Sequence, residues 1–358
     1  MVVRSIRLKQ FRNYDNAVFR FSDSINVICG DNGTGKTNIV EALSVLSNIK
    51  SFRKAGDTIL TKYGTDGYYL QCQVDDDGEE RLFEIGYSAI SKTRRRCKID
   101  GTEIETFSRY YGQLLLVIAA PDDLFLVDGD PDSKRKYTDS VISKYDASYL
   151  QYLSEYRRVL KNRNHILKHV HDGRVSDDLS AWDELFAEKA SHLTRMRSAF
   201  FASFTDIAEY YYSVLSGEAH QLYIWYENCL GVTERDDILH KVGKNRQRDI
   251  IFKTSTCGPH RDSYDIRLDE RPFRETASQG QKRLMALSFK LAERDITETA
   301  SGKRCILCLD DIFSELDKKR RHNLLQLLGS RNQILLTVVD TDLLDSDFTA
   351  SGTVHQLE

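Results

Sequence analysis

The chain has 358 residues, 41% of them hydrophobic, and a formal net charge of −3 at pH 7. This length and apolar content can bury a core in two or three structural units, which excludes a disordered chain. No stretch reaches the roughly 20 apolar residues that cross a bilayer, and residues 1–7 lack the apolar core of a signal peptide. We therefore expect a cytoplasmic protein with no membrane partner.

The first 30 residues predict two strands of a sheet edge, followed by a short strand at 25–29 that leads into a glycine-rich loop. Apolar residues between 39 and 46 then recur at helical spacing. Residues 68–105 predict a β-meander with turns at 75–78 and 100–101. The N-terminal part is thus strand, loop and helix, followed by antiparallel strands.

From about Pro131 the pattern becomes helical. Two long amphipathic helices are predicted, joined near Asp172-Gly173, and the second ends at Gly217, a natural C-cap. An apolar strand is expected at 222–226.

Strands and helices alternate again towards the C-terminus, with a helix after Ser278 and strands at 305–309 and 333–339. The sequence therefore predicts a helical insertion within an α/β unit. Cys305 and Cys308 are the only closely spaced cysteines among the seven, and residues three apart on a strand point to opposite faces. We expect reduced, buried thiols and no zinc site.

A complete Walker A motif follows the strand at 25–29 and precedes the helix, where such a motif has to lie. Its glycines let backbone N–H groups surround a phosphate, and the helix N-terminus adds partial positive charge. Lys36 is expected to reach the β- and γ-phosphates, and Thr37 to give its hydroxyl to Mg²⁺. The predicted nucleotide-binding residues of this motif are Gly30, Asp31, Asn32, Gly33, Thr34, Gly35, Lys36 and Thr37.

Two acidic residues, Asp310 and Asp311, follow the apolar strand at 305–309. A P-loop needs a carboxylate on a neighbouring strand for the metal, and Asp310 is our candidate. Asp311 points to the other side of the backbone and is the candidate that orients or deprotonates the attacking water. Lys36 and Asp311 are thus the predicted catalytic residues, Thr37 and Asp310 the predicted metal residues, and ATP and Mg²⁺ the predicted cofactors.

A second phosphate-binding helix start is predicted at Ser278, Gly280 and Gln281. One protomer needs only one phosphate-binding helix start per nucleotide. We therefore expect the second one to contact the nucleotide of a partner subunit. The Ser-x-Gly-Gln string resembles the signature of ABC ATPases, and Ser314-Glu315-Leu316-Asp317 resembles their D-loop. In that class the two elements act across a head-to-tail dimer that encloses two ATP molecules.

Further motifs along the whole chain are similar to those of the RecF family. They are Phe11-Arg12-Asn13-Tyr14, Pro121-Asp122-Asp123-Leu124, Gly129-Asp130-Pro131, Arg163-Asn164, Gly258-Pro259-His260-Arg261-Asp262 and the run from Leu309 to Asp317. The resemblance implies an α/β fold: an ABC-type P-loop ATPase head with a β-meander subdomain and an inserted helical lobe, without a long coiled coil. The expected division is head residues 1–130, lobe residues 131–254 and head residues 255–358.

The resemblance to RecF also implies a function in recombinational DNA repair and replication-fork maintenance. The expected protein is a weak, DNA-stimulated ATPase that dimerises on ATP and binds duplex DNA near single-strand gaps, without base-sequence preference. RecR and RecO are the implied partners, in loading RecA and in the damage (SOS) response. The role of the motif at 258–262 stays open between a turn in which His260 and Arg261 brace the sheet against the helical lobe and direct ligand contact.

Three departures from these families bear on the mechanism. Ser263 stands where family members usually carry a second Asp, and Asp311 stands where most ABC proteins carry Glu. The shorter side chain reaches less far towards the water, so we predict slow turnover. No His stands near residues 338–342, where ABC transporters carry a switch histidine.

Three alternative functions were weighed against this one. An SMC-like DNA-tethering head is the nearest, but roughly 240 residues separate Thr37 from Ser278, too few for its coiled-coil arm. A transporter ATPase lacks support because Glu and the switch His are missing. A nuclease would need a further acidic metal cluster, which we do not find.

Because the average charge is slightly negative, binding to DNA has to come from local basic patches. Any one patch is more often a solvated face than a DNA site. Four candidates are Lys92–Lys98, Lys134-Arg135-Lys136, Arg157-Arg158 with Lys161 and Arg163, and Lys318-Lys319-Arg320-Arg321.

Overall fold

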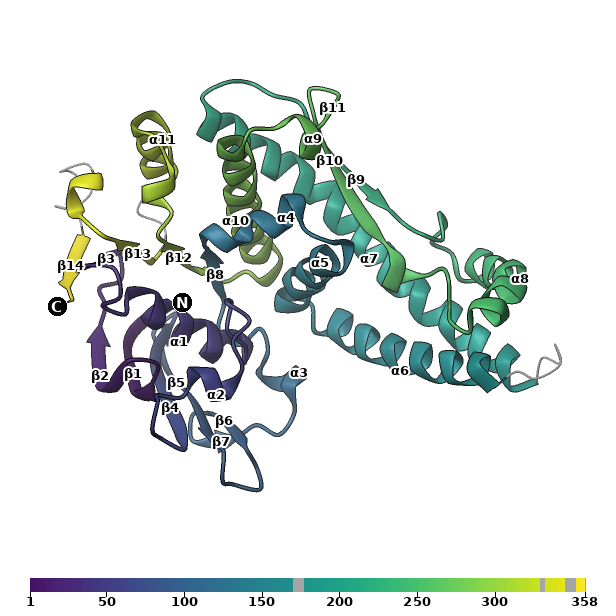
Figure 1. Cartoon of the computed structure of the whole chain (residues 1–358), viewed down its shortest axis with the longest axis horizontal. Coiled ribbons are helices and arrows are strands. Elements are labelled where there is room, and N and C mark those ends of the chain that lie inside the picture. The colour runs from purple at the N-terminus through teal and green to yellow at the C-terminus, as the bar shows by residue number, and fades with distance from the viewer. Residues whose placement is uncertain (170–176, 329–331, 345–351, 358) are drawn as a thin grey trace. The chain divides into compact units, whose positions relative to one another are not determined.

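The computed structural model describes residues 1–169, 177–328, 332–344 and 352–357 (Figure 1). Its contacts divide the chain into two compact units. Unit 1 comprises Met1–Leu124, Tyr210–Ala219 and Ser278–Glu358, and unit 2 comprises Phe125–Glu209 and His220–Ala277. The three-part division at residues 131 and 255 remains a prediction. No helix of the described residues is long and apolar enough to cross a membrane.

A five-stranded parallel sheet forms the centre of unit 1, in the order β14-β3-β13-β12-β8. Strands β3, β12 and β13 are buried along their whole length, as parallel strands covered on both faces must be. The carboxyl ends of β3 and β12 therefore lie at one edge, with β13 between them. The strands are β3 (Ile25–Cys29), β8 (Leu116–Ala119), β12 (Ile306–Asp310), β13 (Ile334–Val338) and β14 (Gly352–Gln356).

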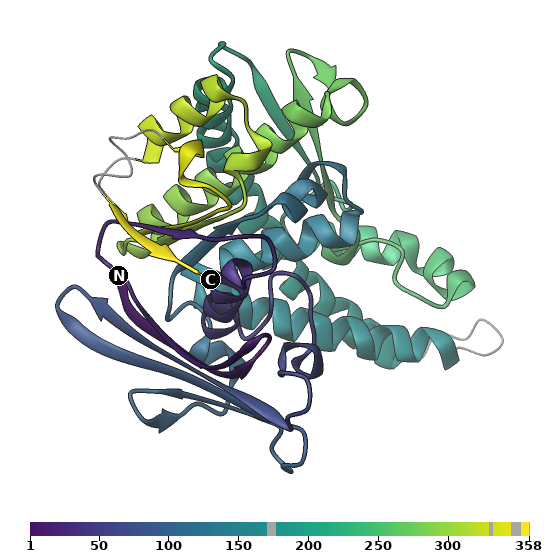
Figure 2. The same ribbon diagram turned by 60° about the vertical axis from the view of Figure 1, so that its left-hand side comes forward.

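A six-stranded antiparallel sheet makes up the rest of the strands of unit 1, in the order β2-β1-β4-β5-β6-β7 (Figure 2). Buried and exposed residues alternate along β4, which is typical of a sheet with one face on the core. Its strands are β1 (Val2–Phe11), β2 (Tyr14–Arg20), β4 (Gly67–Asp76), β5 (Glu79–Ser88), β6 (Arg95–Ile99) and β7 (Thr102–Glu103). The predicted meander and both of its turns are confirmed.

Helix α1 contacts strands of both sheets and so occupies the core of unit 1. The long helix α10 contacts β8 in the same unit. The helices of unit 1 are α1 (Lys36–Asn48), α2 (Asp57–Leu60), α3 (Phe107–Tyr110), η1 (Pro121–Leu124), α10 (Gln279–Ser301), η3 (Phe313–Glu315), α11 (Lys318–Leu328) and η4 (Thr341–Leu343).

Unit 2 combines helices with a three-stranded antiparallel sheet, β11-β10-β9. Helix α7 is 40 residues long, and its last turns, from Tyr210, count with unit 1. The elements are α4 (Phe125–Asp128), α5 (Pro131–Tyr145), α6 (Ala147–His169), α7 (Asp177–Ser216), β9 (Leu222–Glu227), α8 (Arg235–Phe252), η2 (Pro259–Arg261), β10 (Ser263–Leu268), β11 (Arg271–Pro272) and α9 (Phe273–Thr276).

The two long helices predicted after Pro131 are α6 and α7, and the described residues contain no long coiled coil. The second helix ends before Gly217, whose φ of 76° is the left-handed conformation expected of a C-cap glycine. The predicted junction at Asp172-Gly173 lies outside the described residues. Helices α5 and α8 and strand β14 were not anticipated.

Candidate functional site

The predicted Walker A loop connects β3 to α1 in unit 1. Gly33 and Gly35 adopt φ values of 93° and 106°, a region that favours glycine, so the loop can turn its N–H groups inward. Lys36 is buried, and its ammonium group donates to the carbonyls of Gly30 at 2.5 Å and Asp31 at 2.8 Å. The lysine side chain thus lies across the loop that is predicted to bind the phosphates.

The turn between β1 and β2 packs directly on this loop. Asn13 donates from Nδ2 to the carbonyl of Thr34 at 3.1 Å, and the Tyr14 hydroxyl donates to the carbonyl of Gly35 at 3.2 Å. A Cβ on Gly35 would lie 2.6 Å from Asn13 Nδ2 and 2.8 Å from Tyr14 Oη, so the turn requires glycine there. From the sequence, Asn13 and Tyr14 stand out only as part of a family motif, and their contact with the loop could not be predicted.

Helix α1 is fixed to the same turn by an ion pair. Arg12 donates from Nε and Nη2 to the two carboxylate oxygens of Glu41, each at 2.7 Å, and Glu41 is fully buried. Such a bidentate pair adds geometric specificity to its electrostatic energy. The position of the helix N-terminus relative to β1 is therefore well defined.

Asp310 lies at the carboxyl end of β12, where it meets the Walker A helix. The Thr37 hydroxyl donates to Asp310 Oδ1 at 3.0 Å, and the Thr337 hydroxyl of β13 donates to the same oxygen at 2.8 Å. Burial raises the pKa of Asp310 above its ordinary value, while these two hydrogen bonds favour the charged form and oppose the shift. The structure thus brings together the two residues predicted for the metal.

Asp311 has different surroundings. Its backbone adopts φ 53°, in the left-handed region that Asp and Asn tolerate better than most residues. Its N–H donates to Thr337 Oγ1 at 2.9 Å, so one threonine orients both acids. Thr337 could not be recognised from the sequence because its role depends on β13 lying beside β12.

Arg53, in the loop after α1, is a further residue that sequence analysis missed. It is exposed, yet its charge is close enough to lower the pKa of Asp310, against the larger effect of burial. A cation near the metal-side carboxylate is suited to an anionic ligand.

The signature residues begin α10 as predicted. Ser278 and Gln281 form a capping box: Ser278 Oγ accepts from the N–H of Gln281 at 3.3 Å, and Gln281 Oε1 accepts from the N–H of Ser278 at 2.8 Å. Arg283 pairs with Glu315 of the predicted D-loop, and a Cβ on Gly280 would lie 3.1 Å from Arg320 Nη1. Among the described residues, no hydrogen bond or ion pair joins these signature residues to the Walker A loop.

These residues fit a nucleotide with Mg²⁺. The hydroxyl of Thr37 and the carboxylate of Asp310 are hard oxygen ligands, the kind that Mg²⁺ prefers, and they lie side by side. Within the described residues, no group of three or more His, Cys, Asp or Glu forms another candidate metal site.

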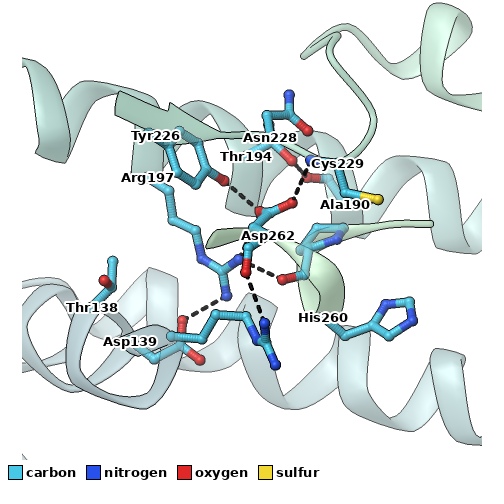
Figure 3. A network of polar contacts seen from close by, with 12 residues as sticks. Thr138, Asp139, Ala190, Thr194, Arg197, Tyr226, Asn228, Cys229, His260 and Asp262 are labelled. Carbon is cyan, nitrogen blue, oxygen red and sulfur yellow. Dashed lines mark hydrogen bonds and ion pairs between the residues drawn. The ribbon is translucent and has the colours of Figure 1, made fainter. Parts of the chain in front are cut away.

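The motif at 258–262 lies within unit 2 and centres on Asp262, which is 1% exposed (Figure 3). Asp262 Oδ2 accepts from Arg197 Nη1 at 2.8 Å and from the Tyr226 hydroxyl at 2.5 Å, and Oδ1 accepts from the N–H of Cys229 at 2.9 Å. Arg197 continues to Asp139 Oδ1 at 2.8 Å. The acid of the motif therefore joins α5, α7 and β9 within the unit.

His260 of the same motif contacts Tyr156 of α6 and Ser255, which follows α8. Its Nδ1 lies 2.6 Å from the Tyr156 hydroxyl and its Nε2 lies 3.0 Å from the carbonyl of Ser255. Because a carbonyl only accepts, Nε2 carries the proton and Nδ1 accepts from Tyr156. Burial lowers the pKa of His260 to about 4. His260 therefore connects elements within unit 2, whereas Arg261 is exposed.

Two of the basic candidates for DNA contact are buried. Arg163 is 1% exposed and binds Asp183 at 2.7 Å and Asp249 at 2.8 Å. Lys134 is 6% exposed and lies over the ring of Tyr264. Neither side chain is available to a phosphate backbone in this conformation. The exposed members of the four patches are Lys92, Arg94, Arg96, Lys136, Arg157, Arg158, Lys161, Lys318 and Lys319.

Comparison with known proteins matches residues 2–356 to the RecF/RecN/SMC N-terminal domain. The DNA replication and repair protein RecF of Ruminiclostridium cellulolyticum is 32% identical over 334 residues, 91% of this chain and 89% of its own length. The protein of the same name from Listeria welshimeri is 34% identical over 366 residues, 100% of this chain and 98% of its own length. The chain belongs to the RecF family.

Solved structures agree with the family assignment. The recombination mediator protein RecF with ATP, from the RecFOR pathway, has a TM-score of 0.88 at 30% identity, covering 96% of this chain and 93% of that one. An Smc head domain bound to ScpA, from Pyrococcus furiosus, has a TM-score of 0.59 at 16% identity and shares the fold. The predicted ABC-type head of the RecF family is therefore confirmed.

Proposed function

We propose that this chain is an ATP-dependent DNA-binding protein of recombinational repair and replication-fork maintenance. The observation that carries the proposal is the meeting of Thr37 with Asp310 beside the Walker A loop, in a chain of the RecF family. Relatives over nearly the whole length bear the name DNA replication and repair protein RecF. The reaction proposed is slow, DNA-stimulated hydrolysis of ATP.

Each site residue has a chemical role in this proposal. The Walker A N–H groups and Lys36 bind the β- and γ-phosphates, and Thr37 and Asp310 would hold Mg²⁺. Bound Mg²⁺ would supply charge neutralisation at the phosphate oxygens. Asp311 orients the attacking water or takes its proton, while Thr337 fixes the backbone of Asp311 and the carboxylate of Asp310.

We also propose that the complete site forms between two copies of the chain. Ser278 Oγ accepts a hydrogen bond from the Gln281 N–H, so its hydroxyl proton remains available to donate to a phosphate. The pairing of Arg283 with Glu315 connects the signature helix to the D-loop within one protomer. Closure of two protomers around two ATP molecules would place Ser278 of one on the γ-phosphate of the other.

The DNA contact proposed is made through phosphates and is therefore independent of base sequence and sensitive to salt. The exposed residues Arg157, Arg158 and Lys161 on α6, and Lys318 and Lys319 at the start of α11, are suited to it. Duplex DNA near single-strand gaps is the proposed target, with RecR and RecO as partners in RecA loading and the damage response, in the cytoplasm. A solved relative is described within the RecFOR pathway, which supports these partners.

The test measures binding of a fluorescent gapped duplex by the wild type with ATP, with ADP and without nucleotide, and by Lys36→Met with ATP, while sedimentation follows particle size. We expect a dimer that binds DNA tightly only with ATP and intact Lys36, with affinity falling steeply as salt rises. If size and DNA affinity were the same in every nucleotide state, the ATP-driven dimer would be wrong and the SMC-like tethering function would be favoured.

A further inference from the structure

Two cysteines lie together at the surface of unit 2. Cys229 is exposed and Cys257 is half-buried, whereas the other five, Cys29, Cys72, Cys97, Cys305 and Cys308, are buried. The Sγ atoms of Cys229 and Cys257 are 2.7 Å apart, and the carbonyl oxygen of Cys229 lies 2.9 Å from Cys257 Sγ, so the single S–H proton of Cys257 can be donated to either acceptor. The two sulfurs therefore face each other, within reach of solvent.

The surrounding fold keeps this pair in place. Cys229 follows β9 and Cys257 precedes η2, and β9 pairs with β10 in a register that sets Glu227 opposite Ser263. The N–H of Cys229 is fixed by the buried carboxylate of Asp262 at 2.9 Å (Figure 3). The two cysteines thus occupy the two ends of the segment that contains α8.

The environment distinguishes the two thiols. The hydrogen bond from Cys257, the N–H of Gly258 and the charge of Arg261 lower the pKa of Cys229 to about 7, against burial and the charge of Asp262. The same hydrogen bond, together with burial, raises the pKa of Cys257. Cys229 is therefore the thiol that ionises more readily and can act as the nucleophile, and Cys257 is the neighbour that can resolve a mixed disulfide.

We propose that Cys229 and Cys257 form a redox-modification site that reacts with small-molecule disulfides and closes to a reversible intramolecular disulfide. The Cys229 thiolate attacks one sulfur of the disulfide, forming a mixed disulfide and releasing one small thiolate. Cys257 then loses its proton to solvent and attacks the sulfur of Cys229, releasing the second small thiol. The protein loses two electrons and two protons in total, and the small disulfide is reduced to two thiols.

Disulfides that form in a reducing compartment are mostly transient or sensing, and a surface pair with one low-pKa thiolate fits that behaviour. The bond would join both ends of the α8 segment next to the motif that contains His260 and Asp262. The inference uses neither the nucleotide site nor DNA, so it stands or falls independently of the proposed function.

The test treats the reduced, full-length protein with oxidised glutathione at pH 7.5, blocks remaining thiols with N-ethylmaleimide and maps peptides by mass spectrometry without reduction. We expect a cross-linked peptide containing Cys229 and Cys257, reversed by dithiothreitol. The five buried cysteines serve as internal controls and should be blocked only after denaturation.

Two variants separate the roles. Cys257→Ser should accumulate glutathione on Cys229, because the resolving thiol is missing. Cys229→Ser should acquire glutathione on Cys257 more slowly than Cys257→Ser acquires it on Cys229, because Cys257 is half-buried whereas Cys229 is exposed. Circular dichroism verifies that both variants fold. If Cys229 and Cys257 both stayed alkylatable in the oxidised wild type, or Cys257→Ser acquired no glutathione, the proposal would be overturned.

Discussion

Asp310 and Asp311 are neighbours in sequence, but they differ in burial, in hydrogen bonding and in backbone conformation. Asp310 is buried and accepts hydrogen bonds from Thr37 and Thr337. Asp311 is half-buried, and its backbone has the left-handed conformation. The left-handed backbone also gives a reason for Asp in place of Glu, since Asp is enriched in that conformation. The short side chain, expected to slow turnover, thus suits the backbone of this turn.

Conservative amide substitutions should distinguish the role of Asp310 from that of Asp311. Asp311→Asn keeps the shape and the tolerance of positive φ but removes the base, so we expect ATP hydrolysis to fall by about 100-fold or more while ATP binding is retained. Asp310→Asn should instead weaken Mg²⁺-dependent ATP binding itself. Single-turnover hydrolysis and nucleotide titration with and without Mg²⁺ measure the two effects. Equal loss of binding in both variants would contradict the assignment.

His260 gives a prediction about pH. Its pKa is about 4 in the folded protein and about 6.5 in the unfolded chain, so only the unfolded chain gains this proton as pH falls from 6.5 to 4. The folded state should therefore lose up to about 3 kcal/mol from this group across that window, and nothing above it. Urea unfolding from pH 7.5 to pH 4.5 should show a smaller loss for His260→Gln than for the wild type. Parallel curves for the two proteins would show that His260 does not carry the effect.

At the scale of elements, a buried arginine ties three helices of unit 2 together. Arg163 of α6 donates to Asp183 of α7 and to Asp249 of α8, and all three side chains are almost fully buried. Ser255 adds a further oxygen at 2.7 Å from Arg163 Nη1. Removal of the arginine would leave the buried carboxylate of Asp249 without its ion-pair partner, while Asp183 would keep its pair with Arg246 at 2.6 Å.

We therefore predict that Arg163→Met destabilises the protein by about 3–5 kcal/mol, because breaking a buried pair from one side leaves uncompensated charge. Arg158→Gln is the matched control, since Arg158 lies exposed on the same helix and should change stability by less than about 0.5 kcal/mol. Chemical denaturation of both variants measures the difference. If Arg163→Met folded as stably as the control and lost only DNA affinity, the earlier grouping of Arg163 with the DNA patch would be restored.

The same helices show how far sequence could predict structure. The strand at 25–29, the loop and α1 were predictable because a buried apolar run and a motif identify them locally. Helix α8 was not, since only Ile238, Val242 and Asp249 of it are buried, too few for a clear apolar stripe. The sequence could not distinguish the buried Arg163 from the exposed Arg158, because the partners of Arg163 lie 20 and 86 residues further along the chain.

In the nucleotide site, too, some residues could be predicted from local sequence and others could not. The Walker A residues and Asp310 could be named from local pattern, whereas Thr337, Arg53 and the packing of Tyr14 depend on which strands and loops become neighbours. Strand order is set by the whole sheet and has no local signature. The brace formed by His260 and Asp262 likewise requires residues from α5, α6, α7 and β9.

At the scale of the whole molecule, the two helix starts predicted to bind phosphate are not joined by a hydrogen bond or ion pair within the part of the chain that the structure describes. Walker A and Asp310 meet within unit 1, while Ser278 caps its own helix beside Glu315 and Arg320. A head-to-tail pair of identical chains would use each surface once on either side, which closes the assembly with two-fold symmetry. Such an arrangement makes a prediction that no single-chain site can satisfy.

The prediction is that two inactive variants restore activity when mixed. Lys36→Met removes the phosphate lysine, and Ser278→Arg blocks the signature cradle, so each alone should hydrolyse ATP at background rates. In a mixed dimer, Lys36 of the Ser278→Arg protomer meets Ser278 of the Lys36→Met protomer and forms one intact site. Equal mixing should yield about a quarter of the wild-type rate, because half the dimers are mixed and each has one intact site of two.

Mixing Lys36→Met with Asp310→Asn is the control, since both changes remove the Walker side of the site and no mixed dimer is repaired. Recovery in the first mixture alone would establish that Ser278 acts across the dimer, and no recovery in either would place the whole reaction within one protomer.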